Sequence, residues 1–302
     1  MTLPPGLLNL ALRLIEKPHM ARAHDHIAMR RRFRLQARLL FPDPPFAAYL
    51  PDRIGGIPGQ WARARPAPGR ARRPGVILYL HGGAYAFGAP ETHRAMLARL
   101  AAASGLDAFL PDYRLAPEHP FPAGHEDALA AYEGLLARGY RASQIALGGD
   151  SAGGGLMLGL LHAICSRDLP RPGAAFALSP WCDLTLSGAS IRENARADPF
   201  LPANRLPELS AIYLAGADPR DPRASPLFGT FAHAPPVLIL VGDSEILLDD
   251  ARAMTRVLKA QGVAARLDVR PGMPHVWPIF QGWLKQADAA LCDIAAFLDR
   301  AL

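Results

Sequence analysis

Short runs of consecutive apolar residues alternate with segments of helical periodicity from residue 76 to the end of the chain. Most of the runs are apolar at nearly every position, which is typical of strands that are covered on both faces of a sheet. We therefore predict an α/β fold with a mostly parallel central sheet flanked by helices. Strands are predicted at residues 76–80, 107–110, 144–148, 174–178, 237–241 and 266–269, and helices at 89–104, 126–138, 154–161, 247–261 and 282–302.

Three stretches lie outside this alternation. Residues 60–65 alternate polar and apolar side chains and predict an antiparallel edge strand. Residues 1–50 have helical periodicity without a strand, and residues 183–226 form a long, proline-punctuated insertion of the kind that is usually functional. We predict that these two segments form a helical cap over a site. The predicted organisation is an N-terminal cap part at 1–50, core parts at 51–182 and 227–302, and a cap insertion at 183–226.

The positive charge of the chain does not by itself identify a partner. The 302 residues carry a net charge of +6, and a positive charge can favour binding to nucleic acid or to an anionic membrane. However, the basic residues are almost all arginines, and most of them stand singly. The one dense run, Arg30-Arg31-Arg32-Phe33-Arg34, is interpreted as a solvated helix face. We therefore predict no nucleic-acid partner.

Cysteine spacing and hydropathy exclude several other classes of protein. Cys165, Cys182 and Cys292 lie far apart and form no pair with metal-ligand spacing, so we predict neither a disulfide framework nor a metal site. No run approaches the roughly 18 apolar residues of a membrane span. The first 20 residues lack the pattern of a secretory signal. The expectation is a cytoplasmic protein with no membrane span.

The pentapeptide Gly149-Asp150-Ser151-Ala152-Gly153 is the first candidate for chemistry. It has the G-x-S-x-G pattern, and it stands between a predicted strand and a predicted helix. That context is the nucleophile elbow, in which glycines permit a tight turn that projects the serine oxygen into a site. Ser151 is therefore the predicted nucleophile.

Acyl transfer by a serine also needs backbone donors that bind the oxyanion of the tetrahedral intermediate. The sequence His81-Gly82-Gly83 directly follows the strand at 76–80, and carboxyl ends of parallel strands are where sites gather. We predict that the N–H groups of Gly82, Gly83 and Ala152 form the oxyanion hole. His81 itself is interpreted as a residue that organises the loop.

The base and the acid follow the last two predicted strands. His275 comes just after the strand at 266–269 and is the only histidine beyond His233, and serine, acid, histidine is the chain order of α/β hydrolases. The residues alone leave the choice of the triad acid open between Asp243 and Glu245, because both stand at the end of the strand at 237–241. Aspartate is the commoner acid of such triads. Two further carboxylates, Asp249 and Asp250, lie in the following predicted helix and are expected to point away or cap locally.

Several motifs together resemble those of the bacterial hormone-sensitive-lipase family of carboxylesterases (family IV). The resemblance extends over nearly the whole chain and implies an α/β-hydrolase fold with a helical cap. It also implies hydrolysis of short to medium acyl esters without a cofactor. Many such proteins are dimers, so a homodimer is possible, and the exposed last strand and the C-terminal helix are the surfaces that it would use. The motifs are His81-Gly82-Gly83-Ala84, Asp112-Tyr113-Arg114-Leu115-Ala116-Pro117-Glu118, the serine pentapeptide, Ser179-Pro180-Trp181 and Pro274-His275.

The resemblance also bears on individual residues. The family's Asp-Pro-Leu-x-Asp motif, aligned on Leu247 and Asp249, places its catalytic first position on Glu245, which we take as the acid in preference to Asp243. Ala84 departs from the family, where many relatives have a third glycine, and a narrower pocket is expected. Candidates for substrate contacts are Tyr85 and Trp181, with Phe87 and Phe33 as weaker ones. Asp112, Arg114, Glu118 and Asp150 are expected to support the oxyanion loop through buried ion pairs and hydrogen bonds.

The sequence thus predicts a serine carboxylesterase that acts on a small-molecule ester. A deacetylase or amidase with the same triad is the enzymatic alternative, since pocket and cap decide the leaving group. A binding protein of the same fold without catalysis is the alternative from another class. Ser151, His275 and an acid are all present in this chain, which favours the enzyme.

Overall fold

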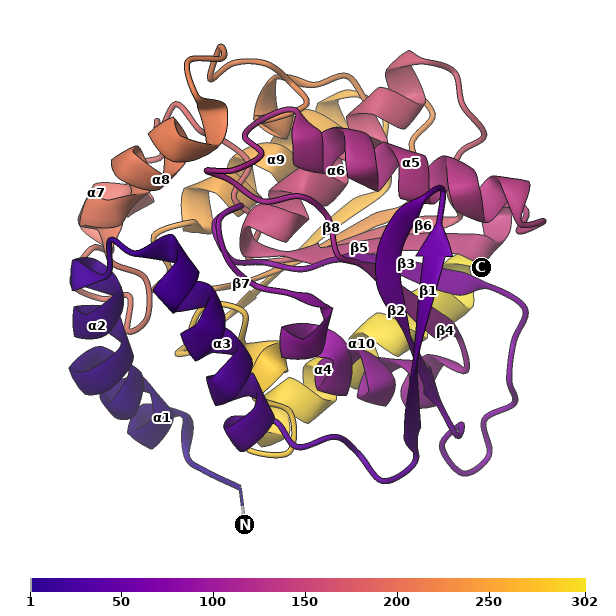
Figure 1. The fold of residues 1–302 in the computed structure, drawn as a ribbon, viewed down its shortest axis with the longest axis horizontal. Helices are drawn as coiled ribbons and strands as arrows, with labels where there is room; N and C mark the ends of the chain where they lie inside the picture. Colours follow the sequence, from indigo (N-terminus) through magenta and orange to yellow (C-terminus); the bar gives the residue numbers. More distant parts are fainter. Residues whose placement is uncertain (1) are drawn as a thin grey trace.

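The computed structural model describes residues 2–302, which form one eight-stranded sheet between two layers of helices (Figure 1). The strand order is β1-β2-β4-β3-β5-β6-β7-β8, and all neighbours from β4 to β8 are parallel. The predicted α/β fold with a mostly parallel sheet is therefore confirmed. The strands are Ala47–Ile54 (β1), Ile57–Ala64 (β2), Val76–Leu80 (β3), Asp107–Pro111 (β4), Ile145–Asp150 (β5), Ala174–Leu178 (β6), Val237–Gly242 (β7) and Ala265–Arg270 (β8).

The antiparallel end of the sheet differs from the prediction. The stretch predicted as an edge strand belongs to β2, which is internal because it pairs with both β1 and β4. The edge is β1, whose side chains are mostly half-buried or exposed, so it lacks the apolar signal of the other strands. Gly55 and Gly56 join β1 to β2, and both have positive φ, as two-residue hairpin turns require.

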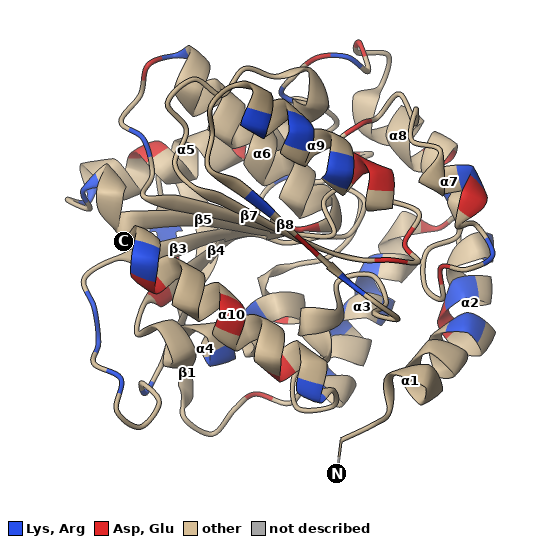
Figure 2. Cartoon of the chain, turned by 180° about the vertical axis from the view of Figure 1, so that it is seen from behind, with Lys and Arg blue, Asp and Glu red and all other residues tan. Residues whose placement is uncertain are grey.

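The central strands are buried on both faces, which explains their uninterrupted apolar sequence. Along β3, Ile77 packs into the core on one side of the sheet and Leu78 into the core on the other. One side is covered by α4 (Pro90–Ser104) and α10 (Lys285–Ala301), and the other by α5 (Ala123–Ala137), α6 (Ser151–Ser166) and α9 (Leu248–Ala260). Charged residues occur along both α9 and α10 (Figure 2), and apart from the buried Asp250 of α9 their side chains are exposed or half-buried.

At the opposite edge, β8 pairs with β7 alone within the described chain, so its other side is open. A homodimer through β8 and α10 stays a prediction.

Two segments outside the sheet lie side by side at one end of the molecule (Figure 1). The Arg13 guanidinium donates to the carbonyl oxygens of Arg196 and Ala197, at 2.9 and 2.8 Å. The Lys17 ammonium donates to those of Ala195 and Asp198. The segments contain α1 (Pro5–Ala11), a π-helical turn η1 (Leu12–Glu16), α2 (Lys17–Arg22) and α3 (His26–Leu40), and α7 (Ser190–Glu193), η3 (Ala203–Arg205), α8 (Leu206–Leu214) and η4 (Pro226–Phe228).

Two further short 3₁₀ helices, η2 (Ala142–Gln144) and η5 (Trp277–Phe280), complete the elements. Among residues 2–302 there is no helix with the length and apolar character needed to cross a membrane.

Candidate active site

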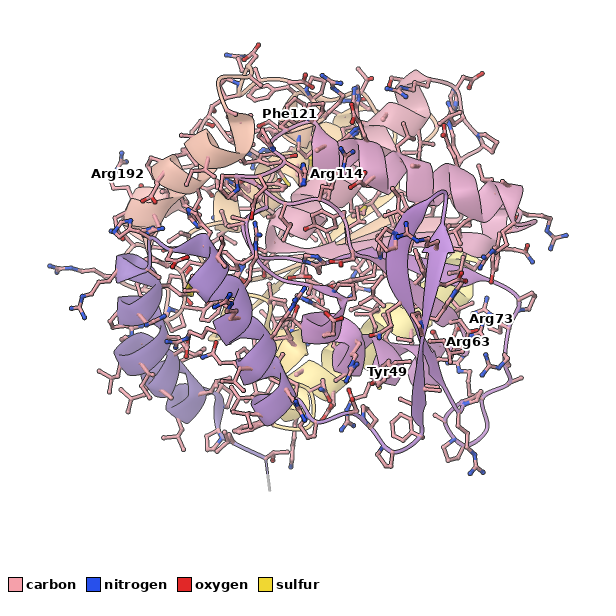
Figure 3. All side chains as sticks on the ribbon, in the orientation of Figure 1. Tyr49, Arg63, Arg73, Arg114, Phe121 and Arg192 are labelled. Carbon is pink, nitrogen blue, oxygen red and sulfur yellow. The ribbon has the colours of Figure 1, made fainter. Side chains whose placement is uncertain are left out.

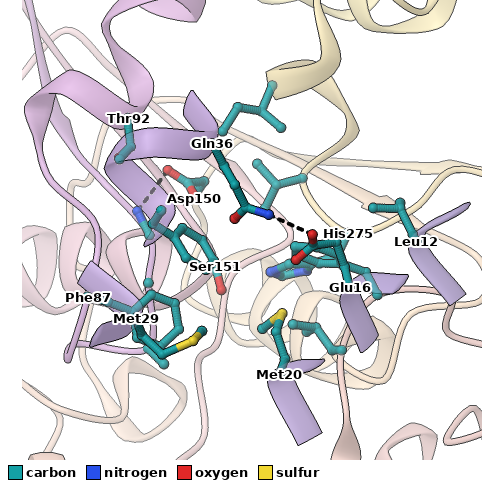
Figure 4. A pocket seen from close by; sticks show the side chains of 18 of the residues that line it. Leu12, Glu16, Met20, Met29, Gln36, Phe87, Thr92, Asp150, Ser151 and His275 are labelled. Carbon is teal, nitrogen blue, oxygen red and sulfur yellow. Dashed lines mark hydrogen bonds between the residues drawn. The ribbon is translucent and has the colours of Figure 1, made fainter. Parts of the chain in front are cut away.

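Ser151 lies at the junction of β5 and α6 with φ +53°, a left-handed conformation that is strained for a residue with a side chain. Only glycine fits at the two flanking positions, Gly149 and Gly153, because a side chain there would collide with the backbone. A Cβ at Gly149 would lie 2.4 Å from the carbonyl oxygen of Gly153, and a Cβ at Gly153 would lie 2.2 Å from that of Leu80. The close approach of these backbones holds the turn that presents Ser151 to a cavity, which it lines together with His275 (Figure 4).

His275 and Glu245 form a buried pair. Nδ1 of His275 lies 2.7 Å from Oε2 of Glu245, and both side chains are almost fully buried. The other carboxylate oxygen of Glu245 accepts from the hydroxyl of Ser179 at 2.7 Å and from the N–H of Gly242 at 2.5 Å. Burial alone lowers the pKa of His275, but the hydrogen bond and charge of Glu245 outweigh it and raise that pKa above the ordinary 6.5.

The other carboxylates of this loop face elsewhere. Asp243 is exposed and accepts from the N–H of Gly272 at 2.9 Å, so it supports the loop before His275 and does not touch the imidazole. Asp250 accepts from the N–H groups of Cys182 and Asp183, while Asp249 accepts from that of Ser190. Asp249 and Asp250 thus fasten the chain after β6 to α9.

The oxyanion loop differs from the sequence prediction at Gly82. Its N–H donates to Oδ1 of Asp150 at 3.0 Å, so it is not available to a substrate oxygen, and this part of the prediction is wrong. The N–H groups of Gly83 and Ala84 have no hydrogen-bond partner within residues 2–302, and both residues line the cavity. Gly83 and Ala84 have φ of +121° and +51°, which turns this backbone toward the site.

Asp150 holds the oxyanion loop to the nucleophile turn. Besides Gly82, its carboxylate accepts from the hydroxyl of Tyr79 at 2.9 Å and lies 3.2 Å from Nε2 of His93. Burial raises the pKa of Asp150, but His93 and the bond from Tyr79 outweigh it and hold the pKa below its ordinary value. A Cβ at Gly82 would lie 2.2 Å from this carboxylate, so glycine is the residue that fits.

His81 organises the same loop, as predicted. Its Nδ1 lies 2.8 Å from the carbonyl oxygen of Gly82, so this nitrogen carries the proton. Its ring stacks on Tyr113 at 4.4 Å, and the Tyr113 hydroxyl donates to the carbonyl of His81. Burial lowers the pKa of His81 to about 3, so the imidazole is neutral at the pH of catalysis.

The expected ion pairs of Arg114 and Glu118 form but are not buried, since these side chains are 44% and 43% exposed, and Asp112 has no ion-pair partner among residues 2–302. Arg114 binds Asp127 with an N–O distance of 2.7 Å (Arg114 is labelled in Figure 3). Glu118 pairs with Arg30, and the same guanidinium donates to the carbonyl oxygens of Ala86 and Ala116. The interpretation of the arginine run as a solvated face is therefore wrong for Arg30, which ties α3 to the loop. The partner of Arg30 lies 88 positions away, and only the tertiary fold brings it there.

The cavity has a volume of about 170 Å³ and is mostly apolar. Trp181, Phe33 and Phe87 line it as the sequence suggested. Tyr85 does not line the cavity, because its ring is buried in a stack on Tyr213, with 3.7 Å between the ring centroids. The prediction of Tyr85 as a substrate contact is therefore wrong. The lining that the sequence did not single out comes from the N-terminal helices, where apolar side chains repeat at helical spacing: Leu12, Met20, Met29, Ala37, Leu40 and Phe41.

Known proteins resemble the chain over most of its length. A family profile described as the alpha/beta hydrolase fold matches residues 77–279. An acetyl-hydrolase of Streptomyces hygroscopicus is 40% identical over 245 residues, which are 81% of this chain and 80% of that protein. A solved esterase of the bacterial hormone-sensitive lipase family matches with a TM-score of 0.91 and 41% identity, over 100% of this chain and 99% of the other. EstE5, in a crystal soaked with p-nitrophenyl butyrate, matches with a TM-score of 0.91 and 37% identity over 98% of both chains.

Proposed function

We propose that this chain, which belongs to the bacterial hormone-sensitive-lipase family of α/β hydrolases and is a carboxylic ester hydrolase, acts through Ser151, His275 and Glu245. The observation that carries the proposal is the buried bond between His275 and Glu245 beside a cavity that Ser151 and His275 share. That bond occupies Nδ1 of the imidazole and leaves Nε2 as the base.

In the proposed reaction, the oxygen of Ser151 attacks the ester carbonyl while its proton moves to His275. Glu245 stabilises the imidazolium that forms. The N–H groups of Gly83, Ala84 and Ala152 bind the oxyanion, since Gly82 is committed to Asp150. Collapse of the intermediate breaks the bond to the alcohol, which leaves with the proton from His275. Water then attacks the acyl-enzyme, with the same groups in the same roles.

The substrate we propose is an ester with a short to medium acyl chain. A cavity of about 170 Å³ with an apolar lining suits a short hydrocarbon chain and offers few partners for a charged group. The names of two relatives fit this size, because one is an acetyl-hydrolase and the other was soaked with a butyrate ester.

A chain-length series of p-nitrophenyl esters tests the substrate class. We expect the highest kcat/KM for acetate or butyrate and a steep fall toward decanoate and palmitate, because longer chains exceed a cavity of about 170 Å³. Matched p-nitroanilides of the same acids test the amidase alternative. Faster turnover of the anilides, or a maximum at palmitate, would contradict the proposal, and no turnover of any substrate would favour a binding protein.

The pH dependence of the reaction follows from the raised pKa of His275. The base acts as neutral imidazole, so kcat/KM falls as the pH drops and His275 becomes protonated. Because Glu245 raises the pKa of His275 above 6.5, we expect the midpoint of this acidic limb above pH 6.5. A pH–rate profile with p-nitrophenyl butyrate measures it. A midpoint well below pH 6.5 would mean that the pair with Glu245 does not control the base.

A further inference from the structure

The large apolar side chains that are strongly exposed within residues 2–302 are confined to the N-terminal part of the chain. Within residues 2–302, every strongly exposed Leu, Ile, Val, Met, Phe, Tyr or Trp lies between residues 7 and 50, and Leu14 and Leu39 are 67% and 70% exposed. Contiguous exposed apolar surface usually marks an interaction site. Most of these residues belong to the N-terminal helical segment: Leu7, Leu10, Leu14, Ile15, Ile27, Leu35, Leu39 and Leu40.

The exposed residues of η1 and α3 belong to neighbouring helices, because η1 and α3 are bonded to each other. Oε1 of Glu16 accepts from Arg32 at 2.8 Å and from Gln36 at 2.6 Å (Figure 4). The exposed Ile15 and Leu35 directly precede the bonded residues Glu16 and Gln36 in sequence. Along α3, every fourth residue is exposed and lies on one side of the helix. We call this surface the N-terminal face: Leu14, Ile15, Ile27, Arg31, Leu35, Arg38 and Leu39.

The N-terminal face is continuous with the cavity. Met29, Phe33 and Ala37 of α3 line the cavity from the inner side of the same helix. Leu40 is both exposed and part of the lining, so apolar surface runs from the outside of α3 to the cavity wall. A molecule that covers the N-terminal face therefore lies against the helix whose inner side lines the cavity.

The charge of this segment is strongly positive. Residues 2–46 contain eight basic and three acidic side chains, a net charge of +5 against +6 for the whole chain. Arg31 and Arg38 are exposed and have no ion-pair or hydrogen-bond partner among the described residues. Basic residues lie on α2 and α3 at this end of the molecule (Figure 2). The face therefore interleaves leucines with unpaired arginines.

We propose that the N-terminal face docks on an anionic lipid surface, with α3 lying between the lipid and the cavity. Helices that lie in a membrane interface place apolar side chains at the acyl boundary and arginines among anionic headgroups. A second copy of this chain is a poorer occupant, because two segments of net charge +5 would face each other across a symmetric interface. The proposal holds whichever residues carry out the chemistry.

Sedimentation with unilamellar vesicles tests this docking. The full chain is expected to partition onto vesicles of phosphatidylcholine mixed with phosphatidylglycerol, and weakly onto phosphatidylcholine alone. The double variant Arg31→Gln/Arg38→Gln should partition about thirtyfold less onto the anionic vesicles, given the contribution of each basic residue near such a surface. The double variant Leu14→Ser/Leu39→Ser should partition at least tenfold less onto the same vesicles. Both variants should keep wild-type turnover of p-nitrophenyl acetate, which shows that they are folded.

Arg256→Gln/Lys259→Gln is the matched control, since it removes two exposed charges from α9, remote from the N-terminal face. We expect it to partition like the wild type. Absence of wild-type binding to anionic vesicles, an equal loss in the control, or no loss in the leucine variant would overturn the proposal. Light scattering could also overturn the proposal. If it found a dimer that Leu14→Ser/Leu39→Ser dissociates, the N-terminal face would be an interface between two copies of this chain.

Discussion

Replacing Ser151 with alanine is expected to lower kcat about 10⁶-fold. The residual rate would be close to the rate that substrate binding and the oxyanion hole provide without the nucleophile. The reason is that no other group can form the acyl-enzyme. Alanine keeps the Cβ that the turn at φ +53° already accommodates, so the elbow is expected to persist. The measurement is the steady-state rate with p-nitrophenyl butyrate, together with the melting temperature of the variant.

Ser166→Ala serves as the control for this substitution. Ser166 stands at the other end of α6, where its hydroxyl donates only to the carbonyl of Ala163. The same change of side chain there should leave kcat within about twofold, because it touches neither the cavity nor the oxyanion loop. Retention of a tenth or more of the activity by a folded Ser151→Ala protein would contradict the assignment of the nucleophile.

Glu245→Gln is expected to lower kcat about 10⁴-fold. The oxygen of the introduced amide would stay with the two donors, Ser179 and Gly242, and its NH₂ would face His275. Nδ1 of His275 would then have to accept a hydrogen bond, and the proton would sit on Nε2, the wrong tautomer for a base. Burial of His275 without its carboxylate also lowers the pKa, so the acidic limb of the residual activity should move to lower pH.

Asp243→Asn is the matched comparison for the acid. The asparagine oxygen can still accept from the N–H of Gly272, so the loop before His275 should persist. We expect kcat within about threefold of the wild type. If Asp243→Asn lost as much activity as Glu245→Gln, or if Glu245→Gln kept a tenth of it, the choice between these two carboxylates would be wrong.

The sequence specifies the core of this fold well, because strands such as β3 and β7 are buried on both faces and are apolar at every position. The same rule could not find β1, whose side chains are largely exposed at the sheet edge. The Gly55-Gly56 pair was the available signal, since two glycines with positive φ are typical of a hairpin.

At the site, chain order and motif position predict Ser151, His275 and Glu245, whereas features that depend on side-chain orientation could not be predicted. The chain order could not show that Asp150 turns its carboxylate to the N–H of Gly82, which moves the proposed donors to Gly83 and Ala84. Tyr85 stands next to the oxyanion loop in sequence, yet stacking on Tyr213 takes its ring away from the cavity. These differences all arise from side-chain packing between segments that are distant in sequence.

Covalent labelling with a p-nitrophenyl alkylphosphonate identifies the nucleophile, because the reagent phosphonylates the serine that attacks an ester. We expect one adduct per chain, found on Ser151 by mass spectrometry of the digested protein, with loss of ester hydrolysis in proportion to labelling. An adduct on any other residue, or full labelling of Ser151 with activity retained, would contradict this expectation.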